Sequence, residues 1–390
     1  MLLMAGEVLR FHAVSKNLPE SGLFRFLAHH QDHVEWRGCT LHDLIQPSFS
    51  FLVGCALPWS IANRKARGQG PGGIWLHTIW RAFLLIALGV FLRSGGSKFT
   101  HFTFEDTLSQ IGLGYVALTF LAWRPMAIQV TGLIAVLAGY WALFAFAPLP
   151  PAGFDPASVG VPTDWPEKLT GFAAHWNKNA HPAHAFDAWF LNLFPRIKPW
   201  LYNGGGYVTL SFIPTLATMI LGLLAGQWLR RTDLAAGRRL GGLVLAGLAG
   251  LALGTLLDRT GACPSVKRIW TPSWVLFSGG WCCLFLAGFH AVADVRRWTG
   301  PLFPLVVVGM NSIFTYVIAH LWDGFFRQNT TNHLNTFLLW LKGPEIFADG
   351  GTFWTVTTGP YAPFFEGAIA LLCIWLCCLW LWRKKLFIRI

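Results

Sequence analysis

Nine stretches of the chain are apolar and long enough for a helix to cross a bilayer, and this feature constrains the fold most. A helix needs about 20 mostly apolar residues to cross the hydrocarbon core of a membrane. Of the 390 residues, 54% are hydrophobic and only 12% are charged, whereas a soluble domain has about 25% charged residues. We therefore predict an all-α polytopic membrane protein. The nine stretches are 41–62, 75–93, 106–123, 127–147, 207–229, 240–257, 273–293, 301–322 and 363–382.

A tenth, shorter apolar stretch begins the chain with the residues MLLMAGEVLRFHAV. It is too short to cross a bilayer, and we interpret it as the second half of a truncated first helix. The prediction is then about ten transmembrane helices in one transmembrane domain, residues 1–390. Two long segments, 148–206 and 323–362, are predicted to be outer loops, and loops of this length are usually functional.

The basic residues gather in short connections between the apolar stretches. Arg64, Lys65 and Arg67 follow the second span, and similar clusters occupy 230–239, 294–300 and the C-terminal tail. Cytoplasmic loops of membrane proteins have this excess of Lys and Arg, so both termini are predicted to be cytoplasmic. The same pattern accounts for the net charge of +12 without a nucleic-acid partner.

Titratable residues lead directly into one of the spans, in HHQDHVEWRGCTLHDLIQPSFSFL at 29–52. Asp43 falls in the first turns of that span, where a carboxylate costs a few kcal/mol unless it faces protein or water. Two interpretations remain open. Asp43 caps the helix and pairs with an arginine, or it orients His33, acting as a base, in a cavity that opens outward. Histidine suits the second role because it titrates near neutral pH.

Other polar groups in apolar stretches are Glu7, Arg10, Asn311 and His320. Glu7 and Arg10 are three residues apart, so on one helix they would form a pair. Most of the 13 histidines fall on the predicted outer side of the membrane, either before the span at 41–62 or in later outer loops, among them the HPAH sequence at 181–184. Its spacing suits metal ligands, but no paired cysteines or suitably spaced acids accompany it, and we predict no metal site.

The segment HVEWRGCTLHDLIQPSFSFLVGCALPWS at 33–60 resembles the heparan-α-glucosaminide N-acetyltransferase family. The stretches LSQIGLGYVAL, GGGYVTLSFIPTLATMILG, KRIWTPSWVLFSGG and GMNSIFTYVIAHL resemble its bacterial relatives, in order along the chain. The chain departs from the family in lacking the opening pattern Ser-x-Asp-x-x-Arg-Gly. Arg37 and His42 also replace residues that are more often neutral.

The resemblance implies a membrane acyltransferase that moves an acetyl group from cytoplasmic acetyl-CoA to an amine or hydroxyl of an outer sugar. It assigns the active histidine to His33, beside Asp43, and it matches a family asparagine to Asn17. Arg64, Lys65 and Arg67 are candidates to bind CoA phosphates, and Asn311 is a further candidate cofactor-binding residue. The bacterial relatives imply a bacterial inner membrane. A homodimer is left open.

Two alternatives to the enzyme are kept. The first is a proton-coupled transporter or flippase of a sugar or lipid-linked substrate, in which Asp43, Glu7, Asn311 and His320 would form a polar path. The second is a non-catalytic membrane scaffold. Within the enzyme interpretation, His33 is either a general base or a nucleophile that holds the acetyl group briefly.

Overall fold

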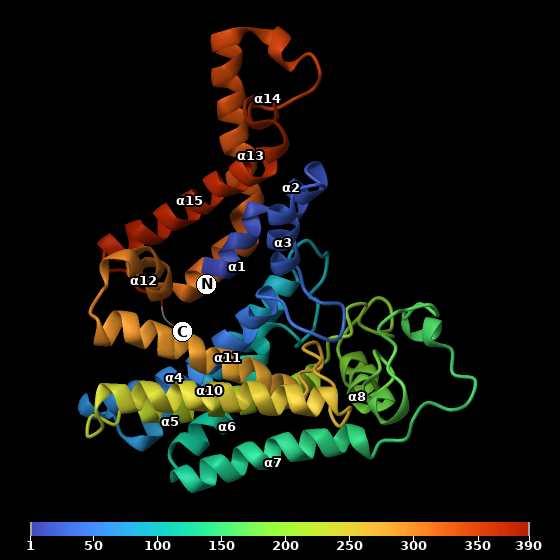
Figure 1. Ribbon diagram of the computed structural model, residues 1–390, viewed down its shortest axis with the longest axis vertical. Coiled ribbons are helices and arrows are strands. Elements are labelled where there is room, and N and C mark those ends of the chain that lie inside the picture. Colours follow the sequence, from blue (N-terminus) through green and yellow to red (C-terminus); the bar gives the residue numbers. More distant parts are fainter. Residues whose placement is uncertain (1, 389–390) are drawn as a thin grey trace. The chain divides into compact units, whose positions relative to one another are not determined.

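The computed structural model describes residues 2–388, which form two compact units (Figure 1). The terminal unit comprises Met1–His33, Thr40–Ile45 and Arg297–Ile390. The central unit comprises Val34–Cys39 and Gln46–Arg296. Regular structure is helical throughout the described residues, apart from one isolated bridge between Arg37 and Val266. The predicted all-α fold class is confirmed.

A helix covers each of the nine predicted spans, and the chain is a multi-pass membrane protein. Seven helices between residues 2 and 388 are long and apolar enough to cross a membrane, or eight if one bent pair counts as a span. Thr107–Ala122 is apolar but shorter. This number is roughly compatible with the prediction of about ten. The span-forming helices are α4 (Ile45–Ala66), α5 (Pro71–Arg93), α6 (Thr107–Ala122), α7 (Met126–Ala145), α9 (Phe212–Leu229), α10 (Ala236–Arg259), α11 (Pro272–His290), the bent pair α12 (Phe303–Met310) and α13 (Ser312–Lys342), and α15 (Ala362–Arg383).

Glycines allow the helices of the central unit to approach closely. A Cβ atom on Gly54 of α4 would lie 1.8 Å from the Met219 carbonyl oxygen of α9, and one on Gly222 would lie 1.9 Å from that of Phe51. Helices α10 and α11 lie side by side (Figure 1), and a Cβ on Gly250 would lie 2.8 Å from the Leu276 carbonyl oxygen. Small residues at such contacts are typical of membrane helices, because packing rather than hydrophobic burial drives their association.

The terminal unit packs the beginning of the chain against its last span. Three short helices come first: α1 (Leu2–Ala5), the 3₁₀ helix η1 (Gly6–Leu9) and α2 (Phe11–Asn17), followed by α3 (Gly22–Gln31). A Cβ on Gly367 of α15 would lie 1.8 Å from the Val8 carbonyl oxygen, so η1 and α15 are in backbone contact there. The Phe11 and Phe364 rings stack with centroids 5.8 Å apart.

The two segments predicted to be outer loops contain short helices and, in one case, a long one. Within 148–206 lie the 3₁₀ helices η3 (Pro156–Val159), η4 (Gly171–Trp176) and η5 (Leu191–Leu193), and the helix α8 (Pro182–Phe190). Within 323–362, α13 continues to Lys342, and α14 (Phe353–Thr358) follows. An i,i+4 ion pair between Asp323 and Arg327, at 2.8 Å, supports the helical continuation.

Candidate functional site

The chain crosses between the two units within the histidine-rich motif. His33 and Thr40–Ile45 belong to the terminal unit, and Val34–Cys39 belongs to the central unit. In the central unit, Trp36 is fully buried and donates through Nε1 to the Trp176 carbonyl oxygen at 3.0 Å. Arg37 pairs with Asp258 at 3.1 Å. These contacts fix Val34–Cys39, the six residues that connect His33 to Thr40–Ile45.

His33 and Asp43 come together in the terminal unit as a bonded pair. The His33 Nδ1 atom lies 2.7 Å from Asp43 Oδ1. The Asp43 side chain is 1% exposed and that of His33 is 38% exposed. The backbone N–H of Thr40 donates to Asp43 Oδ2 at 3.0 Å, and the Thr40 hydroxyl lies 3.0 Å from the same oxygen. The Oδ2 atom of Asp43 is therefore held by Thr40, and its Oδ1 atom is hydrogen-bonded to the His33 imidazole.

A second imidazole and a second carboxylate lie against this pair. The rings of His33 and His42 are 4.5 Å apart between centroids. His42 Nε2 lies 2.7 Å from Glu7 Oε1, with side-chain exposures of 8% and 52% for the two residues. The sequence predicts a pair between Glu7 and Arg10, and this prediction is wrong. The structure pairs Arg10 with Glu366 at 3.3 Å instead.

The backbone explains why Glu7 and Arg10 have different partners. Arg10 has a positive φ of 52°, so the helix ends there and the two side chains do not share a helix face. Gln31 of α3 holds this break, because its Nε2 donates to the Gly6 carbonyl oxygen at 2.7 Å and its Oε1 accepts from Phe11 N at 2.8 Å. An amide that satisfies two backbone groups fixes the position of η1 and therefore of Glu7.

The geometry suits proton transfer or nucleophilic attack by His33. When Nδ1 holds the proton and donates it to Asp43, Nε2 has the lone pair, and this tautomer is the one that the carboxylate favours. An imidazole that acts as base or nucleophile and is oriented by a carboxylate is a recurring arrangement in enzymes. The 38% exposure of His33 leaves its ring accessible, while the carboxylate that orients it is shielded from water.

The two candidate asparagines take part in contacts elsewhere in the terminal unit. Asn17, at the end of α2, donates through Nδ2 to the Pro360 carbonyl oxygen at 3.1 Å. Asn311 lies at the break between α12 and α13, which are bent by 74°. Its Nδ2 donates to the Leu386 carbonyl oxygen at 3.1 Å and its Oδ1 accepts from Ile388 N at 2.9 Å. These hydrogen bonds connect the residues after α15 to the break between α12 and α13.

The three basic candidates lie at the end of α4 and just after it, in the central unit. An Arg64 guanidinium nitrogen lies 2.6 Å from His77 Nε2. Lys65 Nζ lies 4.1 Å above the Trp123 ring, which is a cation–π contact. Arg67 is exposed. Two of the three cations thus already contact other side chains.

The HPAH sequence builds the start of α8. His181 is the N-cap residue, and its Nδ1 accepts from the His184 backbone N–H at 3.2 Å. Burial lowers the pKa of His181 to about 3 and also lowers the pKa of His184, whereas burial raises the pKa of Asp187 to about 7. Both imidazoles are therefore uncharged at neutral pH, as an apolar loop core requires.

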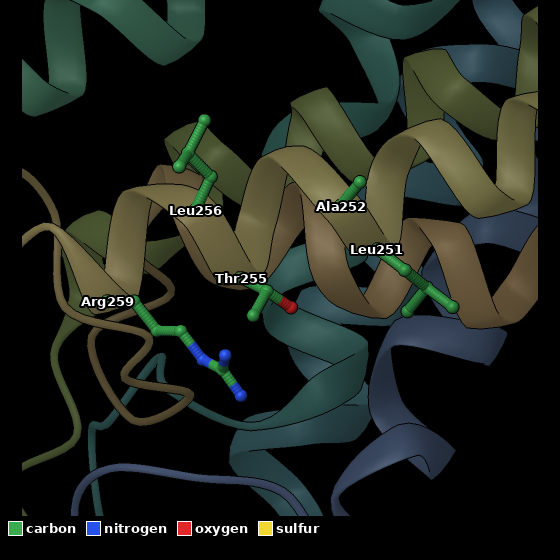
Figure 2. A pocket seen from close by; sticks show the side chains of 5 residues that line it. All are labelled: Leu251, Ala252, Thr255, Leu256 and Arg259. Atoms are coloured by element: carbon green, nitrogen blue, oxygen red, sulfur yellow. The ribbon is translucent and has the colours of Figure 1, made fainter.

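The surface of α10 has a hollow of about 430 Å³ (Figure 2). All five residues that line it belong to this one helix: Leu251, Ala252, Thr255, Leu256 and Arg259. Only 17% of the most apolar window of α10 is buried. We interpret the hollow as a lipid-facing surface, because a single helix gives it no opposing wall.

Comparisons with known proteins identify relatives along most of the chain. No protein-family model matches. The chain is similar to the heparan-alpha-glucosaminide N-acetyltransferase of Homo sapiens, with 24% identity over 83% of this chain and 55% of that protein. It is also similar to the Mus musculus protein of the same name, with 25% identity over 75% of this chain and 50% of that protein. The chain is related to these proteins and spans about half of their length.

Proposed function

We propose that this protein is a membrane-embedded acetyltransferase that moves an acetyl group from acetyl-CoA to an amine or hydroxyl of a sugar. The observation that supports this most directly is the His33–Asp43 pair, with Nδ1 and Oδ1 2.7 Å apart and the carboxylate buried. The relatedness to two N-acetyltransferases supports the reaction class. We further propose that the donor arrives from the cytoplasm, that both termini are cytoplasmic and that the membrane is a bacterial inner membrane.

Two routes for the transfer are compatible with this pair. In the direct route, His33 Nε2 takes the proton from the acceptor, whose nitrogen or oxygen bonds to the thioester carbonyl carbon. The C–S bond then breaks, and the CoA thiolate leaves and gains a proton. In the two-step route, Nε2 itself attacks the carbonyl carbon, CoA leaves, and the acceptor then displaces the imidazole from the acetyl group. General-base help is worth about 10²–10⁴-fold in rate.

Mass spectrometry separates the two routes. Protein incubated with isotopically labelled acetyl-CoA and no acceptor is quenched and digested, and the peptide that contains His33 is examined. A labelled acetyl group on that peptide supports the two-step route. Its absence in enzyme that is fully active when acceptor is added supports direct transfer.

The function itself is tested with the purified full chain in lipid nanodiscs. Labelled acetyl-CoA is supplied with glucosamine, and both free CoA and N-acetylated sugar are measured. We expect the two products in equal amounts. Sugar uptake into proteoliposomes without CoA, together with no acetylated product, would instead support the transporter interpretation.

The basic cluster provides a prediction about the donor. Replacing Arg64, Lys65 and Arg67 together by Gln should raise the KM for acetyl-CoA about tenfold and leave kcat nearly unchanged, because the phosphates of CoA would lose their cationic partners. Steady-state kinetics at fixed acceptor concentration measures this. Replacing Arg238 and Arg239 of α10, which form another basic cluster, by Gln is the control, and an equal rise there would show that only overall charge matters.

The second imidazole provides a prediction about pH. In His42→Gln, the Glu7 carboxylate loses its imidazole partner, so its negative charge acts on His33, which keeps its proton more readily. The acidic limb of the kcat/KM profile should therefore move to higher pH by about one unit. The shift stays small because Glu7 is 52% exposed and water screens its charge. An unchanged acidic limb would mean that His42 only fills space.

A further inference from the structure

The terminal unit has a polar groove that none of the steps above uses. It has a volume of about 340 Å³ and is lined by Gly324, Arg327, Gln328, Thr331 and Asn332 of α13 and by Glu366 of α15. Two helices thus supply its walls. Every lining residue except the glycine has a side chain that forms hydrogen bonds. The size is at the lower end of the range for small-molecule sites.

The charges of the groove cancel, and this limits what it can bind. Arg327 pairs with Asp323 at 2.8 Å and approaches Glu366 at 4.0 Å. Glu366 also pairs with Arg10 at 3.3 Å. Two guanidinium groups therefore face two carboxylates. No uncompensated positive charge remains in this group for a phosphate, so a nucleotide or an anionic lipid headgroup would find no net attraction here.

Neutral hydrogen-bonding groups remain for a ligand. Gln328 and Asn332 each present an amide with both donors and acceptors, and both side chains are exposed. Thr331 accepts from Trp354 Nε1 at 2.9 Å through its hydroxyl oxygen, which orients the hydroxyl. Groups of this kind complement the hydroxyls of a sugar, each of which both donates and accepts.

The groove is connected to the His33 site within the same unit. Its wall residue Glu366 contacts Arg10, and Arg10 follows Glu7 by three residues at the end of η1. Three residues of 3₁₀ helix advance by about 6 Å. Glu7 then contacts His42, whose ring lies against His33. A sugar in the groove would lie next to this short series of contacts.

We propose that the groove between α13 and α15 is the acceptor subsite and binds the hydroxyls of a pyranose unit through its neutral hydrogen-bonding groups. This inference rests on the proposed function, because the bound sugar is an acceptor only if the protein transfers acetyl groups. The binding of the sugar by itself does not depend on catalysis, so the two claims can fail separately.

Gly324 offers a way to block the groove without disturbing the fold. A Cβ atom added at Gly324 meets no other atom within 4 Å, so Gly324→Leu places a side chain in the groove. Leucine also favours a helix by about 1 kcal/mol over glycine. Gly139→Leu in α7 is the matched control, because Gly139 is also an exposed helical glycine with open space around its Cβ position.

The experiment measures sugar binding by saturation-transfer difference NMR, with glucosamine and methyl glucoside as probes. It uses the full chain in nanodiscs with the His33→Ala substitution, so that no turnover occurs. We expect signals from both sugars, an at least tenfold weaker affinity with Gly324→Leu or Asn332→Leu added, and no change with Gly139→Leu. Undiminished binding with Gly324→Leu, or no sugar signal at all, would overturn the proposal.

Kinetics distinguishes the failure of the subsite from the failure of the proposed function. In protein with native His33, Gly324→Leu should raise the KM for glucosamine at least tenfold and leave the KM for acetyl-CoA unchanged. An unchanged glucosamine KM would overturn the subsite while the acetyltransferase proposal stands. The opposite result is also informative. If Gly324→Leu abolishes sugar binding but the native protein never transfers acetyl groups, the sugar-binding site stands and the acetyltransferase proposal fails.

Discussion

His33→Ala should lower acetyl transfer by about 10³-fold or more. Both routes need the ring, because His33 Nε2 either takes the acceptor proton or forms the bond to the acetyl group. The binding of both substrates should persist, since the change removes a side chain that is 38% exposed and leaves no buried cavity. The loss should therefore appear in kcat rather than in KM.

Labelled product formed per minute by purified protein measures this loss. The matched control is His29→Ala, at a histidine in the last turn of α3, and this variant should keep its activity. Thermal unfolding of both variants shows whether the fold is intact. A stable His33→Ala protein with normal turnover would remove His33 from the mechanism.

Asp43→Asn should lower kcat by about 10³-fold while the structure around it stays in place. Asp43 Oδ2 accepts a hydrogen bond from the Thr40 N–H at 3.0 Å, so the amide oxygen of the asparagine would take the position of Oδ2 and keep this hydrogen bond. Its NH₂ group would then face His33 Nδ1 and donate to it, which places the imidazole proton on Nε2. The nitrogen that must act on substrate would have no lone pair, and losses of this kind from an aspartate-to-asparagine change reach about 10⁴-fold.

The control for this change is Asp32→Asn, an acid-to-amide substitution at a side chain that is 60% exposed. It should leave kcat within about twofold of the native value, because exposed ion pairs contribute little. Two measurements on Asp43→Asn are informative together: steady-state kinetics, and the ¹⁵N chemical shifts of His33, which report its tautomer. Full activity with an unchanged tautomer would contradict the orienting role.

The sequence predicts the spans well because their signal is local. An apolar stretch of about 20 residues has few alternatives to a membrane helix, and all nine stretches lie on helices. The continuation of α13 to Lys342 was harder to predict, because the polar residues after Trp322 end the apolar pattern. A polar helix contains no long apolar stretch, and the i,i+4 spacing of Asp323 and Arg327 is a local feature that indicates this one.

The site was predictable only in part. His33 and Asp43 lie ten residues apart, and the motif that contains them indicates the pair. The Glu7–His42 contact joins residues from separate short helices, and it depends on the left-handed Arg10 at the end of η1. The sequence predicts a regular helix there, because a positive φ at a non-glycine residue has no clear sequence signal. The roles proposed for Asn17, Asn311 and the basic cluster remain predictions.

The path of the backbone through the motif has a consequence for the proposed catalytic pair. The chain passes from one unit to the other at His33–Val34, Cys39–Thr40, Ile45–Gln46 and Arg296–Arg297. Three of these four junctions lie within residues 33–46, which contain the proposed catalytic pair. His33 and Asp43 both belong to the terminal unit, although Val34–Cys39 between them belongs to the central unit. The 2.7 Å contact between His33 Nδ1 and Asp43 Oδ1 therefore closes a backbone loop whose middle six residues pack within the central unit.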